Sequence, residues 1–252
     1  MNPTTGIIIQ ARTGSSRLPG KVVQTFIGVQ SIIDILLEKL KILDLPLVLA
    51  TTTNPQDDIL EDVAKRHHVA CFRGSEENVL LRFVEAARQF DFDFVVRVCA
   101  DNPFLSRQLF GELYQKAVDS NFNFDYLSFA YQGKPTILTH FGVFVEMVRT
   151  AALEKALQTT NEKFYLEHVT NYLYHHPAIF NINFFEMPAD LFVHPGIRLT
   201  VDTAVDFAMA ADLYDTLLQQ YGHTEINAIN AYLAQRPDLL EQMQLEIAKH
   251  HK

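Results

Sequence analysis

Short apolar runs alternate with amphipathic helical patterns through the first 120 residues, with brief polar connections between them. The apolar runs have the length and continuity of buried strands and cover Gly6–Ala11, Leu45–Ala50, Val69–Phe72 and Phe94–Cys99. The helical patterns cover residues 32–43, 57–67, 78–90 and 106–120. This alternation predicts an α/β fold in which a parallel sheet is covered by helices on both faces.

The pattern changes after Asn121. Two further strands, a helix and a third strand are expected at Asn121–Tyr131, Gly142–Val148, Asn161–His175 and Ile179–Phe185. The α/β alternation then returns with a strand at Gly196–Val201 and a long helix at Ala204–Tyr221. We therefore expect residues 1–252 to form a single domain with an insertion at about 122–190 and a helical C-terminal tail at about 222–252.

Charge and hydropathy exclude several classes of protein. The 21 basic and 30 acidic residues give a net charge of −9, which argues against nucleic acid as a main partner. No apolar run approaches the ~18 residues that a membrane helix needs, and the first residues lack a basic signal-peptide region, so we expect no membrane association and a cytoplasmic location. Cys71 and Cys99 are expected to be free thiols.

A glycine- and serine-containing loop with a basic residue at each end follows the first predicted strand. Backbone N–H groups at Gly14, Ser15 and Ser16 can turn toward one anion, while Arg12 and Lys21 add charge suited to phosphate. The glycine and lysine spacing fits neither a Walker loop nor a dinucleotide-binding fingerprint. A solvated surface loop is the alternative, but the position at a strand end favours phosphate binding.

Two acidic residues follow predicted strands. Asp101 comes after Phe94–Cys99, and Asp202 comes after Gly196–Val201 and directly before a helix. Taken singly, each has a simpler explanation, because Asp101 begins an Asp-Asn-Pro turn and Asp202 suits a helix N-cap. Mg²⁺, however, takes carboxylate oxygens together with substrate phosphates. Two such carboxylates and a basic loop predict a metal–nucleotide site.

Five stretches in order carry a resemblance to a known family. They are Arg12–Lys21, Arg73-Gly74 with Leu80–Phe83, Arg97 with Ala100–Pro103, Glu167–Thr170, and Arg198–Asp202. Together they resemble the cytidylyltransferases that activate acidic sugars, the CMP-Kdo and CMP-sialic acid synthetases, and most closely the branch of spore-coat polysaccharide biosynthesis. The resemblance covers roughly residues 6–220. The chain departs from that branch at 139–144, where a Pro-Gly step is expected, and at Ala204-Val205, where Glu-Pro or Pro-Glu is usual.

The resemblance implies a three-layer α/β fold similar to nucleotide-diphospho-sugar transferases, a Rossmann-like mixed sheet with an inserted α+β dimerisation region. It implies CTP as substrate and Mg²⁺ as cofactor, with phosphates on Arg12 and Lys21 and metal on Asp101 and Asp202. Arg73 falls where such enzymes contact the base or ribose. The implied nucleotide-binding residues are Ala11, Arg12, Gly14, Ser15, Ser16, Lys21 and Arg73. The segment that shapes the acceptor site contains Glu146, Glu167 and His168.

The resemblance, together with these residues, predicts an Mg²⁺-dependent cytidylyltransferase that moves CMP from CTP to a sugar acid and releases pyrophosphate, in surface polysaccharide biosynthesis. The expected acceptor is a nonulosonic acid or a Kdo-like acid. A glycosyltransferase using a nucleotide-sugar and a non-catalytic nucleotide-binding protein are the alternatives. Alternating aromatic residues in the insertion, Phe122, Phe124, Tyr126 and Phe129, also predict a homodimer built on an exposed apolar face. Packing of these aromatic side chains on their own sheet is the competing hypothesis.

Overall fold

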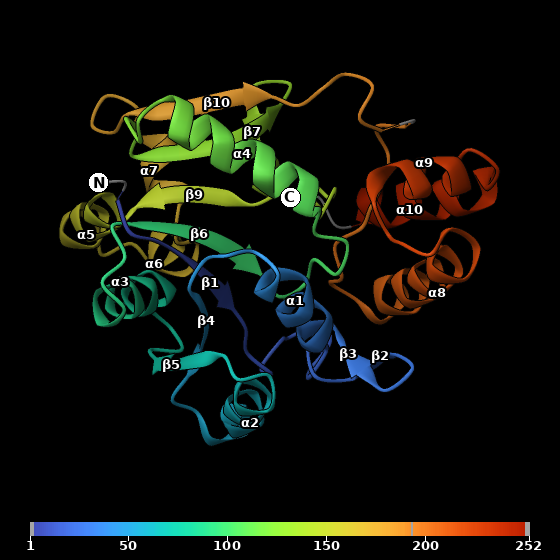
Figure 1. The fold of residues 1–252 in the computed structure, drawn as a ribbon, viewed down its shortest axis with the longest axis horizontal. Helices are drawn as coiled ribbons and strands as arrows, with labels where there is room; N and C mark the ends of the chain where they lie inside the picture. Colours follow the sequence, from blue (N-terminus) through green and yellow to red (C-terminus); the bar gives the residue numbers. More distant parts are fainter. Residues whose placement is uncertain (1–2, 193, 250–252) are drawn as a thin grey trace.

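A mixed sheet of eight strands runs through the computed structural model, which describes residues 3–192 and 194–249. The strand order is β10-β7-β9-β6-β1-β4-β5, with β8 beside β7 (Figure 1). The strands are β1 (Thr5–Gln10), β4 (Leu47–Thr52), β5 (Ala70–Gly74), β6 (Phe94–Cys99), β7 (Tyr126–Tyr131), β8 (Lys134–Pro135), β9 (Glu146–Arg149) and β10 (Ile182–Glu186). A separate antiparallel pair consists of β2 (Thr25–Ile27) and β3 (Gln30–Ser31).

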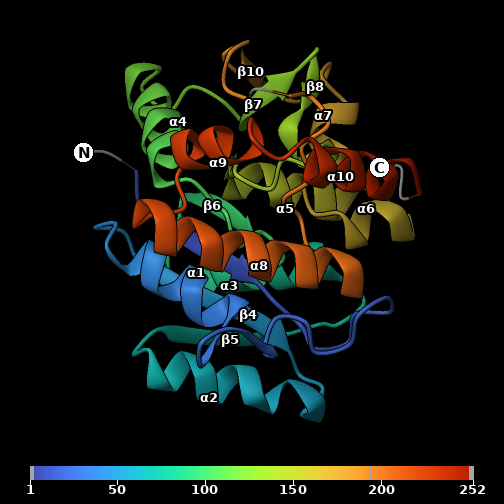
Figure 2. The ribbon, with the colours of Figure 1, turned by 90° about the vertical axis from the view of Figure 1, so that its right-hand side faces the viewer.

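Helices cover both faces of this sheet. They are α1 (Ile32–Lys41), α2 (Asp58–Arg66), α3 (Val79–Gln89), α4 (Arg107–Asp119), α5 (Thr150–Thr159), α6 (Lys163–Glu167), α7 (Asn171–His175), α8 (Ala204–Tyr221), α9 (Ile226–Leu233) and α10 (Pro237–Lys249). Ile7 and Ile9 of β1 pack into one apolar cluster with α1, α4 and α8, whereas Ile8 packs into a second cluster with α3, α5 and α7. Figure 2 shows α1 and α8 lying on one side of the sheet. The predicted three-layer α/β fold is confirmed.

In the first half of the chain, the strands of the main sheet run parallel. β1 pairs with β4 and β6, and β4 pairs with β5, all in the parallel sense. Their carboxyl ends therefore lie along one edge, where the connections to the following helices gather. This edge carries the candidate functional residues described below. Within the described residues, no helix is both long enough and apolar enough to cross a membrane.

The segment 122–190 extends the same sheet. β9 is antiparallel to both β6 and β7, and β10 returns parallel to β7. The first predicted strand here starts later than expected, at Tyr126, because Asn121 and Phe122 take left-handed backbone angles (φ 51° and 55°) that end α4 in a turn. The strand expected from Gly142 likewise begins at Glu146.

Two predicted elements differ from the structure, one in kind and one in continuity. The strand expected at 196–201 is not part of a sheet, because its backbone bonds go to two different segments. Leu199 N–H donates to His140 O, and Val201 N–H donates to Asp101 O. The helix expected at 161–175 is two short helices, α6 and α7, separated at His168, whose φ and ψ of −105° and 70° leave the helical region.

The aromatic residues expected to form an exposed dimer face are buried within the chain. Phe122, Phe124, Tyr126 and Phe129 are 5%, 1%, 0% and 2% exposed. The ring centroids of Phe122 and Phe124 lie 5.2 and 5.1 Å from that of Phe94 on β6. The competing hypothesis, packing on their own sheet, is therefore correct, and the expected exposed aromatic patch is wrong.

Candidate active site

A cavity opens at the carboxyl ends of the parallel strands. Of the residues predicted from the sequence, it is lined by Ala11, Arg12, Ser15, Ser16, Lys21, Asp101 and Asp202. These residues come from the loop after β1, the loop after β6 and the segment before α8, which are up to 191 positions apart in the sequence. The fold brings them together as parallel-strand topology requires. Gly14 lies outside this lining, beside Gln56 and Glu76.

Lys21 connects the two predicted metal carboxylates. Its ammonium Nζ lies 3.5 Å from Asp101 Oδ2 and 3.9 Å from Asp202 Oδ1, and donates a 2.6 Å hydrogen bond to Val201 O. Arg17 Nη2 approaches Asp202 Oδ1 at 3.3 Å. Two carboxylates from separate segments thus share one small polar space. One or two protein carboxylates, with substrate phosphates completing the shell, are the donor set that suits Mg²⁺.

The N-cap hypothesis for Asp202 is not what the structure shows. Thr203 caps α8, with its side chain accepting from Asp206 N–H, and Asp206 in turn accepts from Thr203 N–H. Asp202 is therefore left with its carboxylate turned to Arg17, Lys21 and Arg198. Asp202 therefore lines the cavity and does not cap α8.

A buried ion pair behind the cavity holds Asp202. Arg198 donates to both oxygens of Asp206 at 2.7 Å and to Asp202 Oδ2 at 3.1 Å, and its Nη1 lies 2.5 Å from His140 Nδ1. The side chains of Arg198 and Asp206 are both fully buried. Burial alone raises the pKa of Asp206, but the bonds and charge of Arg198 lower it below its ordinary value of 3.8. Sequence reasoning missed Asp206, although its spacing from Thr203 is that of a capping box.

A second missed residue fixes the basic loop. Asp57, fully buried beyond the end of β4, accepts from Thr13 N–H at 2.7 Å and from Thr13 Oγ1 at 2.6 Å. It also accepts a short hydrogen bond from Thr52 Oγ1. The carboxylate therefore ties the start of the loop to the neighbouring strand, and two bonds to one residue restrain the loop in place. Its sequence context, the N-terminus of a predicted helix, gave no signal for this role.

Arg12 lies at the cavity wall between two carboxylates. Its guanidinium is 3.9 Å from Glu76 Oε1 and 4.0 Å from Glu167 Oε1, and its side chain is about one third exposed. Glu167 and His168 line the same cavity, at the break between α6 and α7. Burial lowers the pKa of His168, against the opposing effect of Glu167, so its imidazole is neutral at pH 7.

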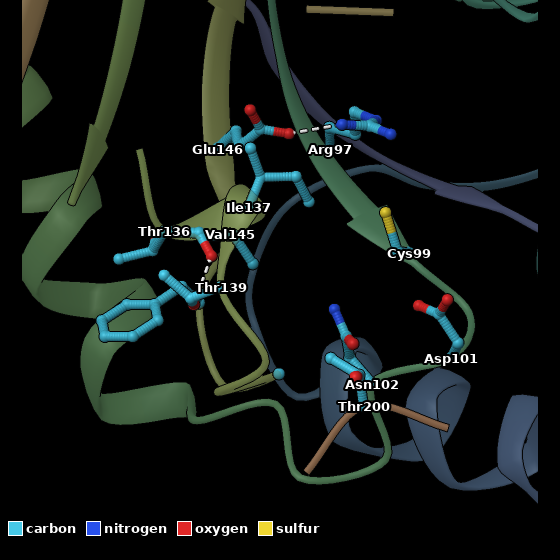
Figure 3. Close-up of a pocket in the computed structure, with 12 residues that line it drawn as sticks. Arg97, Cys99, Asp101, Asn102, Thr136, Ile137, Thr139, Val145, Glu146 and Thr200 are labelled. Atoms are coloured by element: carbon cyan, nitrogen blue, oxygen red, sulfur yellow. Dashed lines mark hydrogen bonds and ion pairs between the residues drawn. The ribbon is translucent and has the colours of Figure 1, made fainter. Parts of the chain in front are cut away.

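A second cavity adjoins the first and shares Arg97, Cys99 and Asp101 with it (Figure 3). Its far wall is the segment 136–146, which includes Thr136, Ile137, Thr139 and Val145. Gly142 in this wall has a φ of +62°, and a Cβ there would come within 3.0 Å of the Leu199 backbone. Only glycine meets both conditions without strain, so the wall depends on this residue.

Glu146 is the centre of a buried network at the junction of the two cavities. It accepts from Arg97 Nη1 at 2.5 Å and from Thr170 Oγ1 at 2.9 Å, and also from the hydroxyl of Tyr126. Burial raises the pKa of Tyr126 well above its ordinary value, and the nearby Glu146 carboxylate raises it further. The Tyr126 hydroxyl therefore keeps its proton and donates it in the hydrogen bond to Glu146. Glu146 therefore orients Arg97, whose Nε donates to Gln10 Oε1 at 3.1 Å.

Arg73 does not join the other predicted residues. Its guanidinium lies 2.7 Å from Asp58 Oδ1 and 3.1 Å from Glu61 Oε2, both on α2. It also donates to the carbonyl oxygens of Thr52 and Asn54, each at 2.9 Å. Arg73 thus links β5 to α2 and the end of β4, outside the residues that line the cavity.

Comparison with known proteins shows the family to which this sequence and fold are similar. A sequence profile of the cytidylyltransferase family matches residues 6–244. The spore coat polysaccharide biosynthesis protein SpsF of Bacillus subtilis is 35% identical over 213 residues, which cover 82% of this chain and 85% of that protein. A cytidylyltransferase structure from Leptospira borgpetersenii has a TM-score of 0.80 at 26% identity, over 94% of this chain and 97% of the other.

A more distant structure shares the fold. CMP:2-keto-3-deoxy-manno-octonic acid synthetase, solved in complex with CTP, has a TM-score of 0.64 at 17% identity, over 84% of this chain and 99% of that chain. At this identity the similarity concerns the arrangement of strands and helices. It places the present sheet among nucleotidyltransferase folds.

Proposed function

This chain belongs to the cytidylyltransferase family and is a nucleotidyltransferase, and from that premise we propose that it transfers CMP from CTP to a small acidic sugar in polysaccharide biosynthesis. The observation that carries the proposal is the convergence of Asp101 and Asp202 on Lys21 at the end of the basic loop. The name of the Bacillus subtilis relative supports the polysaccharide context. The CTP bound to the synthetase of similar fold supports the nucleotide.

The reaction requires little from the protein beyond positioning of the substrates and neutralisation of the phosphate charge. A hydroxyl oxygen of the acceptor attacks the α-phosphorus of CTP, the bond from that phosphorus to the bridging oxygen breaks, and pyrophosphate leaves while the hydroxyl proton passes to solvent. Arg12 and Lys21 bind the phosphates, and the loop held by Asp57 orients them. Asp101 and Asp202 would hold Mg²⁺, which would supply neutralising charge to the phosphate oxygens.

The adjoining cavity is proposed to bind the acceptor. Arg97 reaches both cavities and is 7% exposed, and Glu146 neutralises its charge, so Arg97 would offer an acceptor its guanidinium N–H donors. Guanidinium groups suit carboxylates, which supports an acidic acceptor. Glu146 holds Arg97 in place through an ion pair (Figure 3), and Cys99 and Asp101 line both cavities.

The decisive experiment measures pyrophosphate release from CTP in the presence of Mg²⁺ and a panel of sugar acids. Lys21→Met should reduce kcat/KM for CTP by about tenfold to a hundredfold, because it removes a charge-assisted phosphate contact worth ~1.5–3 kcal/mol. Lys65→Met, which removes an exposed lysine of α2, is the matched control and should leave kcat/KM within twofold. No pyrophosphate from CTP, together with release of a nucleoside monophosphate or diphosphate from a nucleotide-sugar, would support the glycosyltransferase instead.

We also propose that the enzyme is a homodimer assembled through segment 122–190. The support now comes from other residues of that segment: Phe164, Ile179 and Phe184 are 49%, 43% and 39% exposed, and β10 is an edge strand of the sheet. Light scattering should give twice the chain mass of 28.7 kDa. A mass equal to that of one chain would refute the dimer.

A further inference from the structure

Lys39 lies on α1 and reaches across to the loop that follows β6. Its ammonium Nζ donates to Pro103 O at 3.0 Å and to Thr224 Oγ1 at 3.2 Å, and it lies 3.5 Å from Leu105 O. It also lies 5.3 Å from the centre of the Tyr214 ring on α8. One cation thus connects α1, the loop after β6 and the turn between α8 and α9.

The charge of Lys39 lies in an unfavourable environment. Burial lowers the pKa of its ammonium group to about 8 from an ordinary value of 10.5, although the charge of Glu225 acts in the opposite direction. An apolar side chain of similar length would be free of this desolvation penalty. A charged side chain that lowers stability indicates a role other than stability, as is common close to functional sites.

The two carbonyl groups that Lys39 contacts belong to the loop that carries Asp101. Leu105 N–H donates to Asn102 O at 3.2 Å, which closes a turn directly after Asp101. Lys39 contacts this turn from the side of α1. On the other side of the turn, Val201 N–H donates to Asp101 O at 2.9 Å. Asp101 therefore stands between two anchors of its backbone, of which Lys39 supplies one.

The exact position of Asp101 matters for a metal ion bound together with phosphates. Mg²⁺ demands near-ideal octahedral geometry with its ligands at about 2.0–2.1 Å, so a carboxylate displaced by about 1 Å no longer serves as a good ligand. We propose that Lys39 is a positioning residue, which holds the loop after β6 so that the Asp101 carboxylate meets the metal ion that binds with CTP. This inference rests on the proposed use of CTP and Mg²⁺.

The test compares three variants with the wild-type protein. Lys39→Met removes the ammonium group at similar length, and Lys39→Arg keeps a charge and hydrogen-bond donors at the same place. Lys41→Met is the matched control, because Lys41 is an exposed lysine of the same helix that also donates to a carbonyl group, that of His67, at 2.7 Å. Thermal unfolding verifies that each variant is folded.

Two measurements separate the position of the loop from the stability of the fold. Calorimetric titration gives the affinity for Mn²⁺, which accepts the same oxygen ligands as Mg²⁺, in the presence of CTP, and also the affinity for CTP in EDTA. Amide hydrogen exchange of the unliganded proteins compares residues 100–106 with the strands β1 and β4.

We expect Lys39→Met to bind Mn²⁺ at least tenfold more weakly than the wild type, while its affinity for CTP in EDTA stays within twofold. Exchange should become at least tenfold faster in residues 100–106 and stay within twofold in β1 and β4, because only the loop loses an anchor. Lys39→Arg should restore Mn²⁺ affinity to within threefold of the wild type, and Lys41→Met should match the wild type in every measurement.

The inference is overturned if Lys39→Met binds Mn²⁺ within twofold of the wild type. It is also overturned if CTP affinity in EDTA falls as much as Mn²⁺ affinity, or if exchange becomes equally faster in β1 and β4, since Lys39 would then act only on the fold. Wild-type protein that binds no CTP, or that binds CTP without binding Mn²⁺, overturns the proposed use of the nucleotide or of the metal.

Discussion

Asp206→Asn tests whether the buried ion pair behind the cavity positions Asp202, the carboxylate that we propose to bind Mg²⁺. Asp206 accepts two hydrogen bonds from Arg198 at 2.7 Å, and neither side chain is exposed to solvent. Asparagine keeps the size of the side chain and one oxygen for the backbone N–H groups of Asp202 and Thr203. The substitution therefore removes one negative charge and leaves the guanidinium of Arg198 with Asp202 as its remaining carboxylate.

The size of the effect follows from burial. Removing one partner of a buried ion pair costs about 3–5 kcal/mol, because the other charge stays desolvated. Asp202 still lies 3.1 Å from Arg198 Nη2, so we expect the lower end, about 3 kcal/mol in the free energy of unfolding. Arg198 should then hold Asp202 more strongly, which raises the Mg²⁺ concentration needed for half-maximal activity.

Urea unfolding at pH 7 and the Mg²⁺ dependence of pyrophosphate release measure the two effects. Asp215→Asn, on the exposed face of α8, is the control and should change stability by less than about 0.5 kcal/mol. Because the folded-state pKa of Asp206 lies below 3.8, the stabilisation is present above that pH and is lost as the pH falls through the folded-state pKa. A loss under about 1 kcal/mol with an unchanged Mg²⁺ requirement would refute the reasoning.

Three further predictions follow from the same geometry. Asp101→Asn and Asp202→Asn should keep the fold and lose most of the activity, and added Mg²⁺ should partly restore the activity of the variant that lacks the weaker ligand. An unchanged Mg²⁺ dependence in both variants would refute metal binding and leave the two residues with turn or capping roles. Burial lowers the pKa of Lys39 to about 8, so the charged form destabilises the folded protein at neutral pH. The stability of the wild-type protein relative to Lys39→Met should therefore rise between about pH 8 and 10.5. Urea unfolding at several pH values measures this difference. Gly142→Ala should destabilise the protein by about 1–3 kcal/mol in thermal unfolding, since alanine at a φ of +62° is strained and its Cβ meets the Leu199 backbone; an unchanged unfolding temperature would contradict this.

The sequence alone determined the parallel half of the sheet and the chemistry at its edge. Apolar runs of strand length alternate with helical patterns. These periodicities are local properties of the sequence and do not depend on which segments pack against the strand or helix. The loop from Arg12 to Lys21 and the position of Asp101 after β6 follow from the same local rules, because a residue just beyond a parallel strand must lie at the carboxyl edge.

The tertiary structure decided what lies opposite those residues. Lys21 bonds to Val201, which is 180 positions away, and no local pattern specifies a contact of that range. The same holds for the burial of Phe122 and Phe124 against β6, and for the exclusion of Arg73 from the cavity. Whether an aromatic residue is exposed or an arginine reaches the cavity depends on which distant segments pack beside it. Periodicity fixes only the face on which a side chain stands.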